Sequence, residues 1–311
     1  MSSETNPYIP KTATVKDIRL ESGGGRPIKT FRVEFDDPAD AESFKQRPGQ
    51  CAMFNIPGEG ECFISICSPP SWKGYLEFSI MRVGKVTRAI HRLNTGDKVG
   101  LRGPYGNGFP IDEWKGRNMV FIGAGIGIAP LRSIYQHVLG PENRKDFGNV
   151  TLIYGARTPA DLAYKNEFEE FNKRDDVDLH MCIDWKFGPE GMIEEDAAEG
   201  WPKIKMECPA DTEGPEGCNH WTCFVPQLVE VAAPSPDNAI AVTCGPPIAI
   251  KFIIQNLEKL GFADEQIFTT FENRMKCGIG KCGRCNIGEH YVCVDGPVFN
   301  NAQIKRMFND V

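Results

Sequence analysis

The chain has 311 residues, of which 41% are hydrophobic and 25% charged, and its formal net charge is −7 at pH 7. This length allows about two domains with substantial cores. The acidic balance argues against a nucleic-acid partner, which would need a basic footprint. No apolar run reaches the roughly 18 residues of a membrane span, and residues 1–11 carry no secretory signal, so we expect a cytoplasmic protein.

The first hundred residues predict a small antiparallel β-barrel. Six short segments with the pattern of strands are separated by turns rich in Gly, Pro and Asp. These segments are residues 12–21, 28–35, 51–57, 61–69, 74–83 and 97–106. A single helix is expected between the last two strands, at residues 85–93.

After Trp114 the pattern changes to alternating strands and helices, which predicts βαβ units and a parallel sheet. The expected units are a strand–turn–helix at 118–139, a strand at 149–158, a helix at 163–174, a strand at 177–185 and a strand–turn–helix at 239–261. We therefore predict three domains: a β-barrel over residues 1–112, an α/β domain over 113–268, and a small cysteine-rich domain over 269–311.

An irregular segment at about residues 186–223 interrupts the α/β domain. It is rich in Gly, Pro and acidic residues, and a long segment of this kind inside a compact domain is usually functional or disordered. We interpret it as an insertion. This segment either contacts a partner or binds a further metal. The candidate metal ligands in it are Cys208, Cys218, His220 and Cys223.

Two glycine turns follow predicted strands at the same edge of the sheet. Without Cβ atoms, the backbone there can approach a pyrophosphate, and the following helix offers free N–H groups. Because ligands of open α/β sheets bind at this edge, we predict a dinucleotide site between the turns. A tight turn without a ligand is the alternative, and Cys244 is either a small buried residue or a neighbour of the nicotinamide ring. The candidate residues are Gly123, Gly125, Gly127, Cys244, Gly245 and Pro246.

The barrel carries a second set of candidate ligand residues in a suggestive order. A hydroxyl on a strand can bond a flavin ring atom, an arginine fork suits a phosphate, and a glycine opens a helix whose N–H groups favour an anion. For each residue alone, a solvated side chain is the simpler interpretation. The candidates are Ser65, Ile80, Met81, Arg82, Gly84, Val86 and Thr87.

Near the C-terminus, four cysteines follow the spacing C-x4-C-x2-C-x7-C, at Cys277, Cys282, Cys285 and Cys293. This spacing is typical of plant-type [2Fe–2S] sites. The glycines in the loop allow it to wrap around a cluster and to direct N–H groups at the sulfurs. Zinc is an alternative, although its sites usually show two well-separated cysteine pairs. Disulfides are a third interpretation.

The whole pattern resembles the ferredoxin-reductase-like flavoproteins that end in a [2Fe–2S] domain. The residues that carry the resemblance are "GPYGNGF", "GAGIGIAPLRS", "YGARTPADLAYKNEF", "CGPP" and "ENRMKCGIGKCGRCNIG". The family includes the electron-transfer subunit of dihydroorotate dehydrogenase, the gamma subunit of sulfhydrogenases, heterodisulfide-reductase-associated reductases and the small subunit of NADH-dependent ferredoxin:NADP oxidoreductase. The resemblance covers nearly the whole chain except residues 186–223.

The resemblance implies FAD in the barrel, NAD(H) or NADP(H) on the α/β domain and one [2Fe–2S] cluster in the tail. By position, Ser65 matches the residue set against the flavin, and Arg82 with the start of the following helix matches the segment over its pyrophosphate. The two glycine turns match the nicotinamide dinucleotide site, and the four cysteines match the cluster ligands. The family often has an arginine three residues before the Ser/Thr, where this chain has Cys62.

The choice between NADH and NADPH stays open at this point. Arg157 could favour a 2′-phosphate on the ribose, but Asp161 and its acidic neighbours leave the choice open. The chain shows no convincing catalytic acid, base or nucleophile.

A nicotinamide moves two electrons as a hydride and an iron–sulfur cluster moves one, so a flavin has to lie between them. We therefore predict an NAD(P)H-linked electron-transfer subunit. Its expected partners are other iron–sulfur or flavoprotein subunits of a redox complex, such as a hydrogenase or a heterodisulfide-reductase-like enzyme, with ferredoxin as another candidate. The alternatives are a free-standing NAD(P)H:ferredoxin reductase and a non-enzymatic, zinc-bearing interaction subunit.

Overall fold

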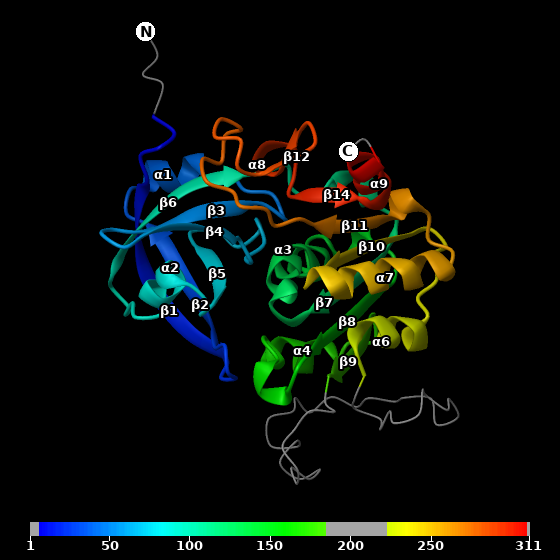
Figure 1. Ribbon diagram of the computed structural model, residues 1–311. Coiled ribbons are helices and arrows are strands. Elements are labelled where there is room, and N and C mark those ends of the chain that lie inside the picture. Colours follow the sequence, from blue (N-terminus) through cyan, green and yellow to red (C-terminus); the bar gives the residue numbers. More distant parts are fainter. Residues whose placement is uncertain (1–5, 185–222, 310–311) are drawn as a thin grey trace.

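The computed structural model describes residues 6–184 and 223–309. An N-terminal β unit and an α/β unit lie side by side, and the C-terminal segment runs across the top of both (Figure 1). In the described ranges, no helix is long and apolar enough to cross a membrane.

The N-terminal unit is the predicted antiparallel barrel. One six-stranded sheet has the order β4-β3-β6-β1-β2-β5, and its edge strands β4 and β5 approach each other. The strands are β1 (Lys11–Ser22), β2 (Ile28–Phe35), β3 (Cys51–Ile56), β4 (Gly60–Ser65), β5 (Leu76–Met81) and β6 (Lys98–Tyr105). Alternate side chains point inward and bury a core around Phe31, Phe54 and Phe78. The predicted helix is present as α2 (Lys85–Ile90).

A short helix that the sequence pattern did not predict, α1 (Pro38–Ser43), follows β2. Asp37 caps it by accepting a hydrogen bond from the Ala39 N–H group at 2.8 Å, and Pro38 occupies the first turn, where its missing N–H costs nothing. Six residues are too few to show a helical period, so only the capping residues could have indicated this helix.

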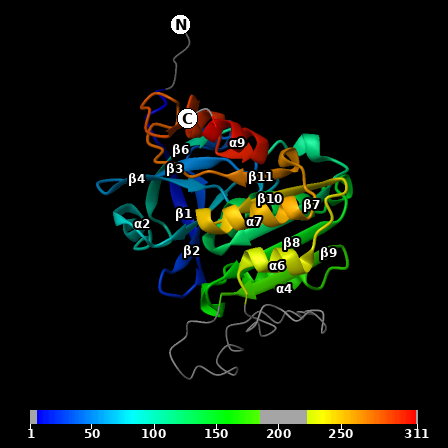
Figure 2. The same ribbon diagram turned by 45° about the vertical axis from the view of Figure 1, so that its right-hand side comes forward.

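The α/β unit is the predicted parallel sheet, covered on both faces (Figure 2). Its sheet order is β14-β11-β10-β7-β8-β9, and only β14 runs antiparallel. The strands are β7 (Asn118–Ala124), β8 (Val150–Ala156), β9 (Val177–Ile183), β10 (Ala239–Cys244), β11 (Ile267–Thr270) and β14 (Val298–Asn300). Helices α3 (Ile128–Leu139) and α4 (Lys165–Phe171) cover one face, and α6 (Val225–Ala232) and α7 (Pro247–Lys259) cover the other.

The C-terminal segment belongs to both units. It contains β12 (Asn286–Ile287), β13 (His290–Tyr291), α8 (Val292–Asp295), β14 and α9 (Asn301–Asn309). The remaining short 3₁₀ turns are η1 (Ile111–Trp114), η2 (Gly125–Gly127), η3 (Arg144–Asp146), η4 (Pro159–Asp161) and η5 (Asp264–Gln266). The domain limits drawn from the sequence stay a prediction, and they fall inside η1 at residue 112 and inside β11 at residue 268.

A buried ion-pair network joins the barrel to the α/β unit. Arg132 on α3 donates to Glu77 on β5 at 2.8 Å, and the exposed fractions of these two side chains are 2% and 0%. From the barrel, Arg19 and Arg32 also reach Glu77, at 2.9 and 3.1 Å. In the α/β unit, both carboxylate oxygens of Glu167 accept hydrogen bonds from Arg132 Nε. Burial raises the pKa of Glu77, but Arg132 and Arg19 outweigh it and the net pKa is lowered, so this carboxylate stays charged at neutral pH.

We predict that Glu77→Gln loosens the contact between the two units. The substitution keeps the shape but leaves buried arginines without their shared counter-charge, which costs about 3 kcal/mol, the lower end of such effects because Glu167 still pairs with Arg132. Urea unfolding followed by tryptophan fluorescence should show a lower midpoint. Glu170→Gln is the control, because it breaks only the exposed pair with Lys173 and should leave the midpoint unchanged. Equal unfolding midpoints for the two variants would contradict the role of Glu77 in joining the two units.

Candidate functional site

The two predicted glycine turns lie together at the carboxyl edge of the parallel sheet. Gly123 at the end of β7 pairs with Cys244 at the end of β10. A Cβ atom at Gly127 would lie 2.3 Å from the Cys244 carbonyl oxygen, so this glycine lets the second turn pack against the first. At Gly123 a Cβ atom would instead meet Ile128 at the start of α3. These two glycines therefore have packing reasons that require no ligand.

Gly125 differs from its neighbours. Its φ of +57° lies in the left-handed region, and a Cβ atom there would meet no atom within 4 Å. The backbone at this position borders open space directly before α3, where N–H groups at the helix start are available to an anion. Of the three glycines, Gly125 is the one whose surroundings suit a bound pyrophosphate.

Cys244 faces the C-terminal segment. Its side chain is buried, and Thr270 at the end of β11 donates a hydrogen bond to its Sγ at 2.9 Å. Burial raises the pKa of Cys244 to about 12, so it remains a thiol at neutral pH. Gly245 is half-buried and Pro246 is exposed, so the turn itself borders solvent.

The barrel candidates are spread along β4 and do not all face outward: Ser65 lies at the end of this strand, whereas Val86 lies close to Gly60 at its start. Ser65 is half-buried at the end of β4. The Ile80 side chain lies in the barrel core at 1% exposure, which leaves only its backbone for a ligand, and its carbonyl oxygen already contacts His91 Nε2 at 2.7 Å. Met81 packs against the core of the α/β unit, and Val86 packs against the barrel core.

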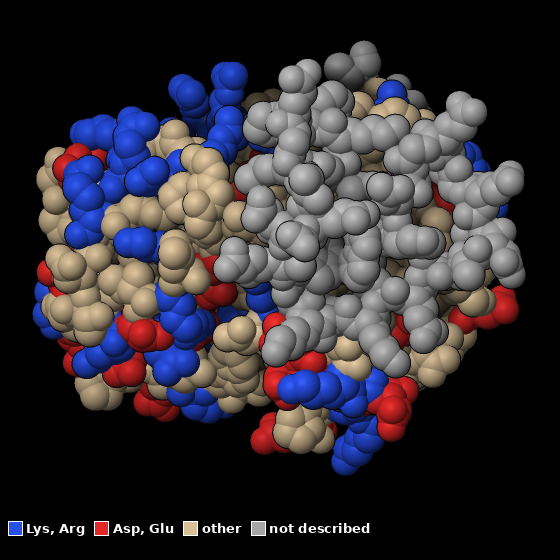
Figure 3. Space-filling model, turned by 90° about the horizontal axis from the view of Figure 1, so that it is seen from below, with Lys and Arg blue, Asp and Glu red and all other residues tan. Residues whose placement is uncertain are grey.

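The start of α2 is ordered by Thr87. Its hydroxyl accepts hydrogen bonds from the N–H groups of Val83 and Gly84, at 2.9 and 2.8 Å. Cationic side chains line this segment, and Figure 3 shows lysine and arginine gathered over the barrel on the underside of the molecule. The exposed cations of the α2 segment are Arg82, Lys85, Arg88 and Arg92. The Arg82 guanidinium makes no ion pair within the described residues, so it is available to a phosphate.

Arg157 is exposed at the carboxyl end of β8. The N–H group of Asp184, which follows β9, donates to the Ala156 carbonyl at 2.9 Å and so lies beside it. Burial, with a smaller contribution from Asp161, raises the pKa of Asp184 to about 6, although Arg157 opposes the shift. One cation and two carboxylates therefore meet at this part of the edge.

The four C-terminal cysteines lie in one loop region, and three of them are buried. Cys277, Cys285 and Cys293 are 7%, 1% and 1% exposed, whereas Cys282 is exposed. Backbone N–H groups point at the sulfurs: Lys281 donates to Cys277 Sγ at 3.3 Å, and Gly280 donates to Cys293 Sγ at 3.4 Å. Burial raises the pKa of Cys277, but the surrounding N–H donors outweigh it and lower the pKa to about 6. The N–H donors of the loop thus favour the thiolate form of Cys277.

The thiols contact each other as two pairs. Cys277 lies beside Cys282, and Cys285 lies beside Cys293. Burial and the neighbouring Cys285 raise the pKa of Cys293 to about 12. Within residues 6–184 and 223–309, no three His, Cys, Asp or Glu side chains are close enough together to hold one metal ion. Two pairs of thiolates are the donor set of a two-iron cluster, in which each iron takes two protein ligands.

The cysteine loop packs on the barrel through Tyr105. The φ of Gly278 is +82°, and a Cβ atom there would lie 2.8 Å from the Tyr105 ring. Cys51 on β3 pairs with Tyr105 on β6 and also with Ser65 on β4. The residue expected beside the flavin and the loop expected around the cluster therefore lie at the two ends of one row across three strands.

Asn107 fixes the other side of the C-terminal segment. Its Nδ2 donates to the carbonyl oxygens of Asp295 and Val298 at 2.9 and 2.8 Å, and its Oδ1 accepts from the Val298 N–H group at 3.1 Å. Tyr105 and Asn107 both lie in the motif "GPYGNGF", but the sequence pattern predicted no role for either residue. The sequence pattern did not mark Thr270 as a site residue either. The sequence feature that could have indicated the roles of Tyr105 and Asn107 is an aromatic ring and an amide in an otherwise glycine-rich turn.

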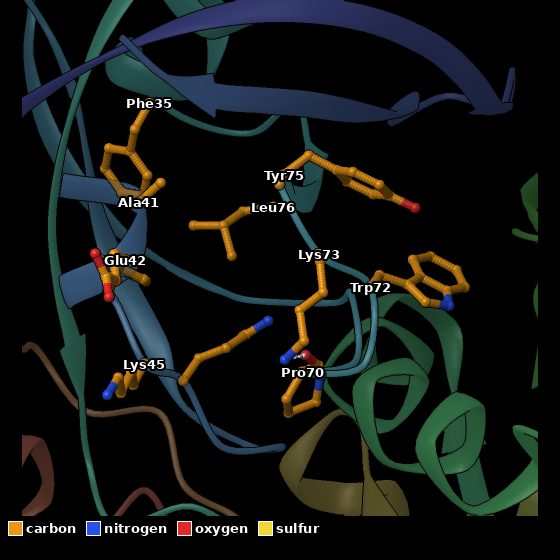
Figure 4. Close-up of a pocket in the computed structure, with 12 residues that line it drawn as sticks. Phe35, Ala41, Glu42, Lys45, Pro70, Trp72, Lys73, Tyr75 and Leu76 are labelled. Carbon is orange, nitrogen blue, oxygen red and sulfur yellow. Dashed lines mark hydrogen bonds between the residues drawn. The ribbon is translucent and has the colours of Figure 1, made fainter. Parts of the chain in front are cut away.

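A pocket of about 440 Å³ lies elsewhere on the barrel (Figure 4). The segment after β2 and the loop before β5 line it, with Phe35, Trp72 and Tyr75 among its walls. None of the predicted site residues lines this pocket. Its loop instead supports the contact between the units, since the Arg132 guanidinium lies 5.0 Å from the centre of the Trp72 ring.

We predict that Gly278→Ala disturbs the cysteine loop more than Gly283→Ala. The φ angles of Gly278 and Gly283 are +82° and +70°, so an alanine at either position would be strained to a similar degree. Only the alanine at residue 278 would also collide with Tyr105, because the space around Gly283 is open. Iron content after anaerobic reconstitution should fall further for Gly278→Ala. Equal iron in the two variants would show that the loop does not depend on its contact with the barrel.

Comparisons with known proteins agree with this architecture. Residues 121–255 match the model of the oxidoreductase NAD-binding domain, and residues 272–305 match the iron–sulfur cluster binding domain of dihydroorotate dehydrogenase B. A chain of the NADH-dependent reduced ferredoxin–NADP oxidoreductase has the same fold, with a TM-score of 0.62 and 20% identity over 99% of this chain and 95% of that one.

Curated relatives extend over almost the whole chain. Sulfhydrogenase 1 subunit gamma of Pyrococcus furiosus is 40% identical over 275 residues, which are 87% of this chain and 85% of the relative. A protein of Methanocaldococcus jannaschii named "Probable dihydroorotate dehydrogenase B (NAD(+)), electron transfer subunit" is 30% identical over 95% of this chain and 91% of its own length. The chain therefore belongs to the family of FAD- and NAD(P)-binding oxidoreductases with a C-terminal iron–sulfur domain that includes the sulfhydrogenase gamma subunits and these electron-transfer subunits.

Proposed function

We propose that this chain is the NAD(P)H-linked electron-transfer subunit of a larger redox complex, and that its cluster is [2Fe–2S]. The observation that carries the proposal is the row Ser65, Cys51 and Tyr105 across β4, β3 and β6, which ends on the cysteine loop at Gly278. The residue expected at the flavin lies on this sheet, and the loop expected at the cluster packs against the other end of the same row. A short, fixed separation is what electron transfer between two bound groups requires.

The nucleotide edge adjoins the same region. Thr270 is the last residue of β11, and its hydroxyl donates a hydrogen bond to Cys244 Sγ. The chain then continues directly into the cysteine loop. When bound, the nicotinamide supplies two electrons as a hydride, the flavin passes them on singly and the cluster carries one at a time. The protein residues hold these groups in order and provide no acid or base to the reaction.

Each candidate residue has a distinct part in this proposal. The Ser65 hydroxyl orients the flavin ring, the Arg82 guanidinium pairs with its pyrophosphate, and the Gly125 backbone binds the nicotinamide dinucleotide at the start of α3. Cys277 and Cys282 would hold one iron, and Cys285 and Cys293 the other, as their pairwise contacts suggest. The N–H groups of Gly280 and Lys281 stabilise the thiolate charge.

A partner subunit is expected close to the cluster. Cys282 is exposed, and the neighbouring side chains of Tyr291 and Val294 are 38% and 48% exposed despite being apolar. The names of the curated relatives designate subunits of sulfhydrogenase and dihydroorotate dehydrogenase B. We propose an iron–sulfur oxidoreductase partner, of the hydrogenase or heterodisulfide-reductase-like kind, that docks over this surface.

The first test is the visible spectrum of the anaerobically purified chain before and after NADH, and then NADPH. We expect flavin bands with a broad iron–sulfur shoulder, bleached by the nucleotide, and copurification with a partner. A colourless, zinc-containing preparation would overturn the proposal in favour of an interaction subunit. A monomer with full ferredoxin-reducing activity would favour a free-standing reductase.

A variant pair separates the flavin from the cluster. Cys285→Ser should abolish the iron–sulfur shoulder and electron delivery to one-electron acceptors, while NADH still bleaches the flavin bands. Cys62→Ser is the matched control, since Cys62 is a half-buried barrel thiol outside the two cysteine pairs and should retain both signals. Iron retained in Cys285→Ser would contradict the ligand assignment.

Nucleotide choice should depend on pH through Asp184. Because burial raises the pKa of Asp184 to about 6, its carboxylate is charged above that pH and repels a 2′-phosphate near Arg157. The ratio of kcat/KM for NADPH to that for NADH should therefore fall about threefold to tenfold as the pH rises through 6. Asp184→Asn should keep the ratio high at pH 7.5 and remove the dependence.

Asp176→Asn serves as the control for this experiment. Asp176 precedes β9 at the opposite end of the strand, where it pairs with Arg144 and Arg174. Its removal should leave the ratio unchanged at every pH. A ratio that depends on pH in the same way in Asp184→Asn and in the unaltered protein would contradict the role of Asp184.

A further inference from the structure

Two cysteines outside the cluster loop face each other in the α/β unit. Cys182 lies in β9, and Cys223 lies shortly before α6. The N–H group of Cys223 donates to the Ile183 carbonyl at 3.1 Å, which holds its backbone beside the end of β9. The two thiols are neighbours in the hydrophobic cluster beneath α6. Neither belongs to the nucleotide, flavin or cluster sites described above.

The sheet provides room for this contact. Within β9, Met181 and Ile183 pack on the face covered by α3 and α4, whereas Cys182 packs on the opposite face, beneath α6. The residue paired with Cys182 on β8 is Gly155. A Cβ atom at Gly155 would lie 2.6 Å from Cys182 Sγ, so a larger residue there would displace the thiol. The glycine therefore preserves the space that both thiols share.

The two thiols have unequal environments. Cys182 is 1% exposed, whereas Cys223 is half-buried and reachable from solvent. The hydrogen bond that Cys223 accepts from Cys182 lowers the pKa of Cys223 below that of an ordinary thiol, and the same contact together with burial raises the pKa of Cys182. A reachable thiolate beside a buried second thiol is the arrangement of a cysteine pair that undergoes reversible oxidation.

We propose that Cys182 and Cys223 form a reversible dithiol–disulfide centre that exchanges with small aliphatic disulfides. The Cys223 thiolate attacks one sulfur of the incoming disulfide, forms a mixed disulfide and releases one thiol. The Cys182 thiol then loses its proton and attacks Cys223 Sγ, which closes the Cys182–Cys223 bond and releases the second thiol. Two protein thiols are oxidised, and one disulfide is reduced to two thiols.

The consequence is a covalent closure between the end of β9 and the start of α6. Residues 183–222 lie between the two cysteines in the sequence, so the bond would join the two ends of this whole stretch. Disulfides are rare in reducing compartments, and those that form there are usually transient and redox-responsive. The centre would therefore report the thiol–disulfide balance around the protein, independently of the electron path through the cluster.

The first test equilibrates the holoprotein anaerobically with glutathione buffers of increasing glutathione disulfide, followed by acid quenching, alkylation and tryptic mass spectrometry. We expect peptides 175–186 and 206–251 to become linked as the buffer becomes more oxidising, and to separate again with excess dithiothreitol. The link should persist in the double variant Cys208→Ser/Cys218→Ser and disappear in Cys223→Ser. Free Cys182 at every ratio, or linkage of Cys223 to Cys208 or Cys218, would overturn the proposal.

A second test uses reactivity and does not require the disulfide. In a short pulse of iodoacetamide at pH 7, Cys223 should react at least about tenfold faster than Cys62, which is also half-buried but whose pKa burial raises to about 11. Cys182→Ala should slow Cys223, because the hydrogen bond is lost. Equal rates for Cys223 and Cys62 would overturn the proposal. So would zinc or iron that the protein retains and Cys223→Ser loses, since the pair would then be metal ligands.

Discussion

The contact between Arg132 and Glu77 determines how the other parts of the molecule are placed. Removing both charges from water is costly, and the cost is offset only when the barrel and the α/β unit are docked, so that each charge meets its partners. The guanidinium also lies over two aromatic rings, 5.0 Å from the ring centre of Trp72 and 4.8 Å from that of Tyr164. The docked arrangement then fixes the barrel edge near Ser65 relative to the glycine turn at Gly125.

The C-terminal segment depends on that docking because it is attached to both units. β14 pairs with β11 at the edge of the parallel sheet, while Asn107 and Tyr105 hold the segment from the barrel side. A shift between the units would pull these attachments apart. The nucleotide turn, the β4–β3–β6 row and the cysteine loop therefore behave as one rigid frame, which suits groups that exchange electrons over short distances.

The sequence predicted the features that depend on residues close together in the chain, namely the strands, the helices and the cysteine loop. Short β segments between turns gave the barrel strands, alternating strands and helices gave the parallel sheet, and cysteine spacing gave the loop with its four sulfurs. The contacts that join distant segments were not predictable in this way. Glu77 and Arg132 are 55 residues apart, and nothing in either neighbourhood marks them as partners. The thiol pair of Cys182 and Cys223 was hidden for the same reason, since the sequence pattern assigned Cys223 to the insertion.

The pairing of β14 with β11 also bears on how the chain matures during synthesis. A ribosome releases residues 1–270 before β14 exists, so the growing sheet has an unpaired edge at β11 for that interval. Exposed strand edges invite pairing with other chains, and β14 removes this hazard by covering the edge. Truncation before residue 277 would therefore promote aggregation of the nascent nucleotide-binding unit as well as remove the cysteine loop.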